Sequence, residues 1–197
     1  VNAGNGIDLD GSSSYNVIEN DTIIHVSHVA IISAYGGDYH HNVIRNNLLH
    51  HNHTHLSPQN GADRYLIENN VMYYSGLVNA DATGKAFQPT CTNSIVRYNV
   101  IYADSGNPQG WRGILAPTVM FSSAEFGVPK NMAYNRLYNN LFYGETDEGY
   151  PVSAIQLIDN DRDKGTRIEQ NRFVNNIIAG GTRYQVMDEN GGVSDAE

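Results

Sequence analysis

The most regular feature of the sequence is a short pattern of apolar and polar positions that occurs six times. Each copy has an apolar pair, two polar residues, an Asn or Asp and another apolar pair. The copies are NVIENDTII (Asn16 to Ile24), NVIRNNLLH (Asn42 to His50), YLIENNVMY (Tyr65 to Tyr73), SIVRYNVIY (Ser94 to Tyr102), NRLYNNLFY (Asn135 to Tyr143) and NRFVNNIIA (Asn171 to Ala179). Short apolar runs predict strands, and their recurrence predicts a solenoid with one copy in each coil.

The copies align on a column of Asn residues. Its members are Asp21, Asn47, Asn70, Asn99, Asn140 and Asn176, at successive spacings of 26, 23, 29, 41 and 36 residues. The shorter spacings are typical of a minimal β-helix coil, and the longer ones predict insertions. A side-chain amide both donates and accepts, so we expect stacked Asn side chains to hydrogen-bond from coil to coil. Two residues earlier, a row of mostly alternating charge predicts ion pairs between strands: Glu19, Arg45, Glu68, Arg97 and Tyr138.

A second set of short strands is predicted between the copies, which gives two strand columns per coil. Alternation places one row inward, namely Ile7, Ile31, Leu56, Phe87, Leu115 and Ile155. The adjacent row faces outward, namely Asp8, Ile32, Ser57, Gln88, Ala116 and Gln156. Pro58, Pro89 and Pro117 recur at one position, and because proline cannot donate a ladder hydrogen bond, we expect the sheet to end or bend there.

Composition limits the kind of molecule. The chain of 197 residues has the size of one domain, residues 1–197, and its net charge of −9 argues against a nucleic-acid partner. The single Cys91 excludes an internal disulfide, and no apolar run reaches membrane-spanning length. Because the chain opens at Val1 with no initiator Met, we expect it to be a segment of a longer chain.

The repeated NVIxNNxI segments resemble the parallel β-helix repeat of the pectate-lyase-like superfamily, from Gly6 to about Gly181. The resemblance implies an all-β, single-stranded, right-handed parallel β-helix of about six coils with a long loop insertion. It also implies a secreted or cell-surface protein that acts on or binds polysaccharide. The Asp pair, GHG and RIK motifs of polygalacturonases and the DPHD motif of alginate epimerases are absent.

A row of basic residues is the candidate for chemistry. In the predicted register His28, His53 and Arg112 take equivalent positions three residues before the inward apolar residue, and Lys85 follows one place later. In a lyase acting on a uronate-containing polysaccharide, Arg112 would neutralise the uronate carboxylate, and Lys85 or His53 would remove the proton. Solvent-exposed residues aligned by chance are the alternative.

Binding positions are predicted next to this row. Trp111 in the long insertion is expected to wall a groove, Gln88 belongs to the outward row, and Tyr73, Tyr102 and Tyr143 form a column beside His50. Aromatic side chains stack on sugar faces, although core-rim packing explains the Tyr column equally well.

Two metal sites are considered. Asp159, Asp161 and Asp163 alternate before Gly165, the oxygen-rich spacing of a calcium loop, and a solvated acidic loop is the alternative. His51, His53 and His55 also alternate and would share one face of an extended strand, where a transition metal binds.

The function predicted is that of a polysaccharide lyase or glycoside hydrolase. The alternative is a non-catalytic structural or carbohydrate-binding segment of a fibre, tailspike or adhesin. Because no capping element is recognisable at either end of the repeats, end-to-end or lateral self-association is also expected.

Overall fold

The computed structural model describes residues 4–33, 37–59, 61–75, 86–104, 119–122, 124–125, 128–129, 131–145, 153–158, 168–180 and 184–188. Within these ranges all regular elements are β-strands, and the expected all-β class is confirmed. No helix there is long and apolar enough to cross a membrane.

Two six-stranded parallel sheets contain the repeated segments. Sheet B consists of β2 (Val17–Glu19), β5 (Val43–Arg45), β9 (Leu66–Glu68), β12 (Ile95–Arg97), β18 (Arg136–Tyr138) and β22 (Arg172–Val174). Sheet C consists of β3 (Thr22–Ile24), β6 (Leu48–His50), β10 (Val71–Tyr73), β13 (Val100–Asp104), β19 (Leu141–Glu145) and β23 (Ile177–Ala179). Each repeated segment is therefore two short strands rather than one.

Three further parallel sheets complete the arrangement. Sheet A consists of β1 (Ile7–Leu9), β4 (Val29–Ser33) and β7 (Thr54–Pro58). Sheet D consists of β8 (Ala62–Asp63), β11 (Cys91–Thr92), β17 (Met132–Ala133) and β21 (Ile168–Glu169). Sheet E consists of β14 (Val119–Ser122), β20 (Ser153–Ile158) and β24 (Tyr184–Asp188). An antiparallel pair, β15 (Ala124–Glu125) and β16 (Val128–Pro129), lies between β14 and β17 in the chain.

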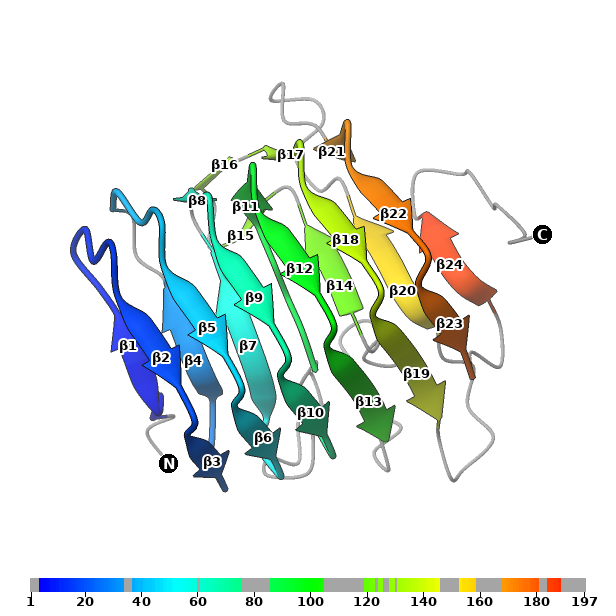
Figure 1. The fold of residues 1–197 in the computed structure, drawn as a ribbon, viewed down its shortest axis with the longest axis horizontal. Coiled ribbons are helices and arrows are strands. Elements are labelled where there is room, and N and C mark those ends of the chain that lie inside the picture. Colours follow the sequence, from blue (N-terminus) through cyan, green and yellow to red (C-terminus); the bar gives the residue numbers. More distant parts are fainter. Residues whose placement is uncertain are drawn as a thin grey trace.

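The chain visits these sheets in a repeating order. From β8 onward it passes from sheet D to B to C and then toward the next pass, so strands of one sheet lie side by side in chain order (Figure 1). We call one such pass a coil. This stacking of parallel strands is consistent with a parallel β-helix, and it corrects the expectation of only two strand columns per coil.

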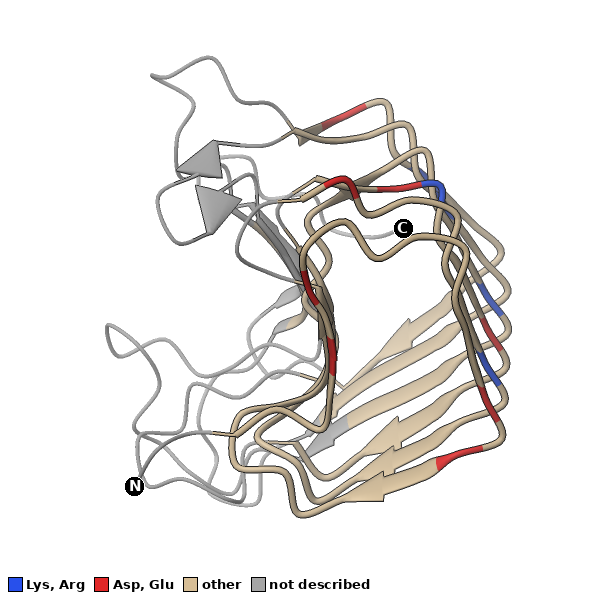
Figure 2. Ribbon diagram, turned by 90° about the vertical axis from the view of Figure 1, so that its left-hand side faces the viewer, with Lys and Arg blue, Asp and Glu red and all other residues tan. Residues whose placement is uncertain are grey.

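The core lies between the sheets. The middle residue of most three-residue strands points inward, as Ile18, Leu49 and Met72 do, and these side chains form one continuous cluster. In the view of Figure 2 the described sheets surround this shared interior. The predicted inward row is confirmed for Ile31, Leu56, Phe87 and Ile155, which are in the cluster, and for Ile7, which packs against it.

The Asn column forms the expected ladder. Asn47, Asn70, Asn99 and Asn140 each donate from Nδ2 to Oδ1 of the next member, at 3.0–3.1 Å. A second ladder at the start of each copy was not predicted. It runs through Asn16 and Asn42 and through Asn135 and Asn171, with Tyr65 and Ser94 between them. Both ladders are largely buried, so they satisfy backbone and side-chain groups where the chain bends.

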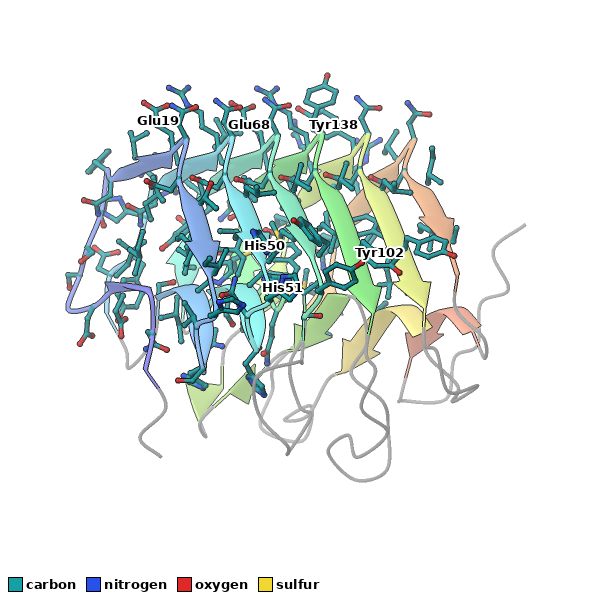
Figure 3. The ribbon with its side chains drawn as sticks, turned by 90° about the horizontal axis from the view of Figure 1, so that it is seen from below. Glu19, His50, His51, Glu68, Tyr102 and Tyr138 are labelled. Atoms are coloured by element: carbon teal, nitrogen blue, oxygen red, sulfur yellow. The ribbon has the colours of Figure 1, made fainter. Side chains whose placement is uncertain are left out.

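The predicted charged row lies on the outer face of sheet B. Arg45 Nε contacts Glu19 Oε2 at 2.6 Å, Arg97 Nη2 contacts Glu68 Oε2 at 2.6 Å, and Arg97 Nη1 donates to Tyr138 Oη at 3.0 Å. Figure 3 labels Glu19, Glu68 and Tyr138 along this edge. The expectation of ion pairs between neighbouring strands is confirmed.

One register expectation is wrong. Val119 of β14 lies opposite Ile155 of β20, in the place that Leu115 was expected to take. The expected alignment paired the segment ILAPT, which contains Leu115, with AIQLI, which contains Ile155. The strand that pairs with β20 lies four residues later in the chain. Pro58 is the last residue of β7, as expected for a proline that cannot continue the ladder.

Candidate functional site

Histidine and tyrosine side chains form a stripe along sheet C. The third residue of each strand faces outward, because the second residue faces the core. Pairing aligns these outward residues across the sheet as Ile24, His50, Tyr73, Tyr102, Tyr143 and Ala179. The predicted column of Tyr73, Tyr102 and Tyr143 beside His50 is thus confirmed.

Rings along the stripe are in direct contact. His50 stacks on Tyr73 with centroids 4.9 Å apart and planes 8° apart, and Tyr102 stacks on Tyr143 at 5.3 Å and 13°. Figure 3 labels His50, His51 and Tyr102 on this face. The two stacks are joined by Tyr74, which lies edge-on to Tyr102 at 6.0 Å.

A second row of rings comes from the turn that follows sheet C. His25, His51 and Tyr74 each have positive φ, of 54–57°, which turns their side chains out beside the stripe. His51 contacts His25 at 5.7 Å and Tyr74 at 5.0 Å between ring centroids. We call the set His25, His50, His51, Tyr73, Tyr74, Tyr102 and Tyr143 the aromatic stripe.

The surface beside the aromatic stripe is apolar. The other outward column of sheet C is Thr22, Leu48, Val71, Val100, Leu141 and Ile177. Neither column contains a charged residue, although the chain carries a net charge of −9. Phenol hydroxyls and imidazole nitrogens are therefore polar groups that the aromatic stripe offers to a ligand.

The His50 imidazole favours the neutral form. His50 Nδ1 lies 2.7 Å from His51 Nδ1, a contact that requires one nitrogen to donate and the other to accept. Burial, and after it the neighbouring His51 and His25, lower the pKa of His50. His50 therefore contributes a hydrogen-bonding group rather than a fixed positive charge.

The predicted catalytic row is only partly described. Val29 pairs with Thr54, which places His28 beside His53, and their ring centroids are 6.3 Å apart. His28 Nδ1 lies 2.8 Å from Asn5 Oδ1. Lys85, Arg112 and Trp111 lie outside the described residues. The register that aligned Arg112 with His53 assumed Leu115 opposite Ile155, so that argument for Arg112 no longer holds.

The outward row of sheet A is more enclosed than expected. Gln88 is only 6 % exposed and Ser57 is fully buried; the Ser57 hydroxyl donates to the Gln88 carbonyl at 3.0 Å. Ile32 packs with Val29 in a small apolar cluster of its own. Ile32, Ser57 and Gln88 are thus covered in the folded chain, whereas Asp8 is exposed. Burial depends on what lies above a strand as well as on its alternation.

The histidine metal site is not formed. His51 lies in the aromatic stripe, whereas His55 is fully buried, and burial lowers the pKa of His55 to about 3. No group of three metal-binding side chains occurs within the part of the chain that the structure describes. Asp159, Asp161 and Asp163 lie outside that part, so the calcium loop remains a prediction.

Comparisons with known proteins give no relative. No family model matches the chain, and neither a curated protein nor a solved structure matches it. The candidate site therefore has to be interpreted from its own chemistry.

Proposed function

We propose that the chain is a right-handed parallel β-helix of about six coils, of the pectate-lyase-like kind, that binds an extended polysaccharide along its aromatic stripe. The observation that carries the proposal is the unbroken series of ring contacts from His25 to Tyr143. Equivalent side chains in neighbouring coils are separated by one strand spacing, about 4.8 Å. A sugar polymer laid along the stack would therefore meet similar groups at each coil.

The stripe offers two kinds of contact to a sugar. Within each stack the ring faces cover one another, so a ligand would meet ring edges, phenol hydroxyls and imidazole nitrogens. The tilted rings of His51 and Tyr74, with planes 51° apart, leave faces that can pack on the C–H groups of a sugar. The aliphatic column beside them would pack against the apolar side of the polymer.

We further propose that the protein is secreted or located at the cell surface and cleaves the bound polysaccharide as a lyase or hydrolase. The neighbouring imidazoles of His28 and His53 support this part. A neutral imidazole can remove the proton next to a uronate carboxylate, which is the step that begins elimination. If no product forms while binding persists, a non-catalytic fibre, tailspike or adhesin segment becomes the better assignment.

Binding is tested with Tyr102→Ala against a panel of neutral and uronate-containing oligosaccharides by isothermal titration calorimetry. We expect at least a roughly tenfold weaker affinity, because a stacking ring is removed from the middle of the stripe. Tyr98→Ala is the matched control, since Tyr98 is an exposed tyrosine at the bend between sheets B and C. Equal affinities of both variants and the wild type would reject the stripe as the binding site.

A further inference from the structure

Two bends use a residue with positive φ in all six coils, and their residue types differ. The bend between sheets B and C uses Asn in five of six coils: Asn20, Asn46, Asn69, Tyr98, Asn139 and Asn175. The bend before sheet B has only one Asn: Tyr15, His41, Arg64, Asn93, Tyr134 and Gln170. We call this second set the corner row. Asn tolerates the left-handed conformation better than Tyr, Arg or Gln, and His shares part of that tolerance.

Backbone strain at the corner row is not offset by burial. Tyr15 is 71 % exposed and Tyr134 is 57 % exposed, and His41, Arg64 and Asn93 are exposed as well. Tyr15 stacks on His41 with centroids 5.1 Å apart and planes 7° apart, a contact at the surface of the protein. Residues held in sparsely populated backbone conformations cluster at functional sites, and the corner row places five such residues, all but Asn93, along one edge.

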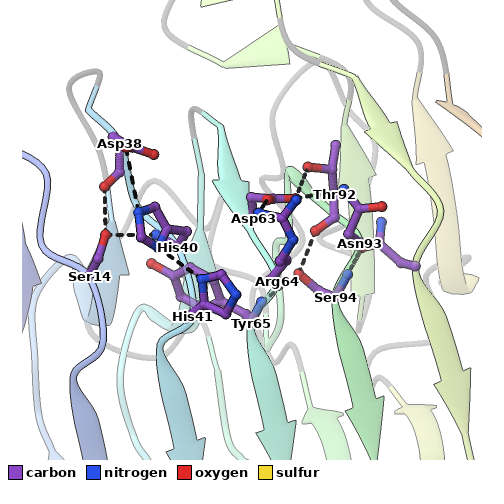
Figure 4. Close-up of polar contacts among 11 residues, drawn as sticks. Ser14, Asp38, His40, His41, Asp63, Arg64, Tyr65, Thr92, Asn93 and Ser94 are labelled. Carbon is purple, nitrogen blue, oxygen red and sulfur yellow. Dashed lines mark hydrogen bonds and ion pairs between the residues drawn. The ribbon is translucent and has the colours of Figure 1, made fainter.

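The Asp63 carboxylate holds polar side chains of the corner row in place. Asp63 Oδ1 accepts hydrogen bonds from Thr92 Oγ1 and Asn93 Nδ2, both at 2.7 Å, and Asp63 Oδ2 lies 2.8 Å from Arg64 Nη1 (Figure 4). The carboxylate therefore fixes Arg64 and Asn93 in adjacent coils. Most N–H groups of the guanidinium remain available to donate to a ligand.

One coil earlier, a second polar group continues the row. His40 Nδ1 lies 2.9 Å from His41 Nδ1, and His40 Nε2 lies 3.5 Å from Asp38 Oδ2 (Figure 4). Ser14 donates to the Asp38 carbonyl at 2.8 Å. Rings, amides, carboxylates and a guanidinium thus alternate along neighbouring coils, the mixture that recognises hydroxyl groups and a sugar face together.

Local charge decides which sugar fits. The carboxylates of Asp38 and Asp63 outnumber the single guanidinium of Arg64 along this part of the corner row. A uronate carboxylate would meet net repulsion, whereas the hydroxyls of an uncharged sugar can donate to these carboxylates and accept from Arg64.

We propose that the corner row is a second carbohydrate-binding edge, specific for a neutral glycan and separate from the aromatic stripe. Sheet B and most of sheet C lie between the two edges along each coil, so the edges can bind independently. Arg64 and Asn93 hold sugar hydroxyls, and Tyr15 and Tyr134 present rings to sugar faces. This proposal goes beyond the proposed function, because a glycan can bind at the corner row whether or not the aromatic stripe binds a polysaccharide.

The test replaces corner-row residues by the residue that the turn prefers. Tyr15→Asn and Arg64→Asn are titrated with neutral gluco-, galacto- and mannohexaose and with hexagalacturonate by calorimetry, and their thermal midpoints are measured. We expect affinity for one neutral hexasaccharide to fall at least about tenfold. The midpoint should stay the same or rise by about 1–3 °C, because Asn relieves the strained φ.

Tyr98→Asn is the matched control, since Tyr98 is 50 % exposed and has a φ of 57° at the Asn-rich bend. It should match the stability of the corner variants and bind as the wild type does. If Tyr15→Asn misfolds, the affinity of Tyr134→Asn for the same hexasaccharides tests the proposal instead. The proposal is overturned if all corner variants bind neutral hexasaccharides like the wild type, or if affinity falls only as far as in Tyr98→Asn.

Discussion

Asn70 donates from Nδ2 to Oδ1 of Asn99 at 3.0 Å, and the same oxygen accepts the backbone N–H of Asn70 at 2.9 Å. Asn99→Ala removes that acceptor, so the buried backbone N–H of Asn70 loses its partner and Nδ2 keeps only the Ile44 carbonyl. We expect the free energy of unfolding to fall by about 2–4 kcal/mol, measured by urea denaturation. Asn69→Gly, at an exposed position with φ of 56°, should change it by less than about 0.5 kcal/mol. Similar losses in both variants would contradict a stabilising ladder.

The two ion pairs of sheet B should differ in strength. The Glu68 side chain is 12 % exposed and the Glu19 side chain 38 %. Arg97→Met removes the ion-pair partner of the Glu68 carboxylate in a poorly solvated place, so we expect a loss of about 1–2 kcal/mol. Arg45→Met should cost less than about 1 kcal/mol, because water replaces the lost partner. The two pair energies are measured by double-mutant cycles with Glu68→Gln and Glu19→Gln. Equal energies for the two pairs would show that burial of the carboxylate does not strengthen the ion pair.

Buried His55 should make the fold sensitive to acid. Burial lowers its pKa from 6.5 to about 3, so the native state keeps His55 neutral while the unfolded chain takes up a proton below pH 6.5. Stability is therefore intact above pH 6.5 and is lost as the pH falls toward 3, by up to about 1.4 kcal/mol per pH unit. His55→Gln does not titrate, and its stability should decline less between pH 6.5 and 4. A parallel decline in both proteins would assign the acid sensitivity to other groups.

The catalytic proposal predicts loss of product without loss of fold. On a uronate-containing polysaccharide, lyase activity releases an unsaturated sugar that absorbs in the ultraviolet, and we expect this signal to fall at least about a hundredfold in Lys85→Ala and His53→Ala. Arg112→Ala tests the carboxylate-binding role independently of the incorrect register. Circular dichroism checks that each variant is folded. Undiminished activity in all three variants would exclude this row from catalysis.

The calcium loop predicts a metal-dependent melting temperature. If Asp159, Asp161 and Asp163 bind calcium, the ion stabilises the folded state to which it binds, and a 100-fold excess over Kd adds about 2.7 kcal/mol. Magnesium should have a smaller effect, because it needs a tighter octahedral site. An equal calcium shift in Asp161→Ala and in the wild type would rule the loop out.

Much of the fold could be predicted because the repeat is short and its polar positions are nearly invariant along the chain. The Asn column, the charged row and the inward position of Leu56 follow from one alignment. The division of each copy into two strands could not be predicted from the sequence. Asn20 and Asn46 mark the bend between the strands only through their positive φ, and in the sequence they are ordinary polar residues. The second ladder was hidden because Tyr65 and Ser94 interrupt its Asn residues.

The candidate site was harder to predict, because it depends on what covers each face. Tyr73 and Tyr102 were placed correctly from their column, but Gln88 was expected on an open face and is buried. His51 and His55 are four residues apart, yet one reaches the surface and the other the interior because the chain turns between them. The corner row gave no signal in sequence, since a turn that prefers Asn is recognisable only once the φ angles are known.

Successive rungs of the Asn ladder are 26, 23, 29, 41 and 36 residues apart along the chain, yet the rungs from Asn47 onward form the same hydrogen bond. Each rung offers a donor to the following coil and an acceptor to the preceding one. A coil can therefore be lengthened between rungs, or gained and lost as a whole unit, without leaving an unpaired amide. The hydrogen bonds of the ladder therefore do not depend on how many residues a coil contains. The connecting loops can change in length and sequence while neighbouring coils stay in register.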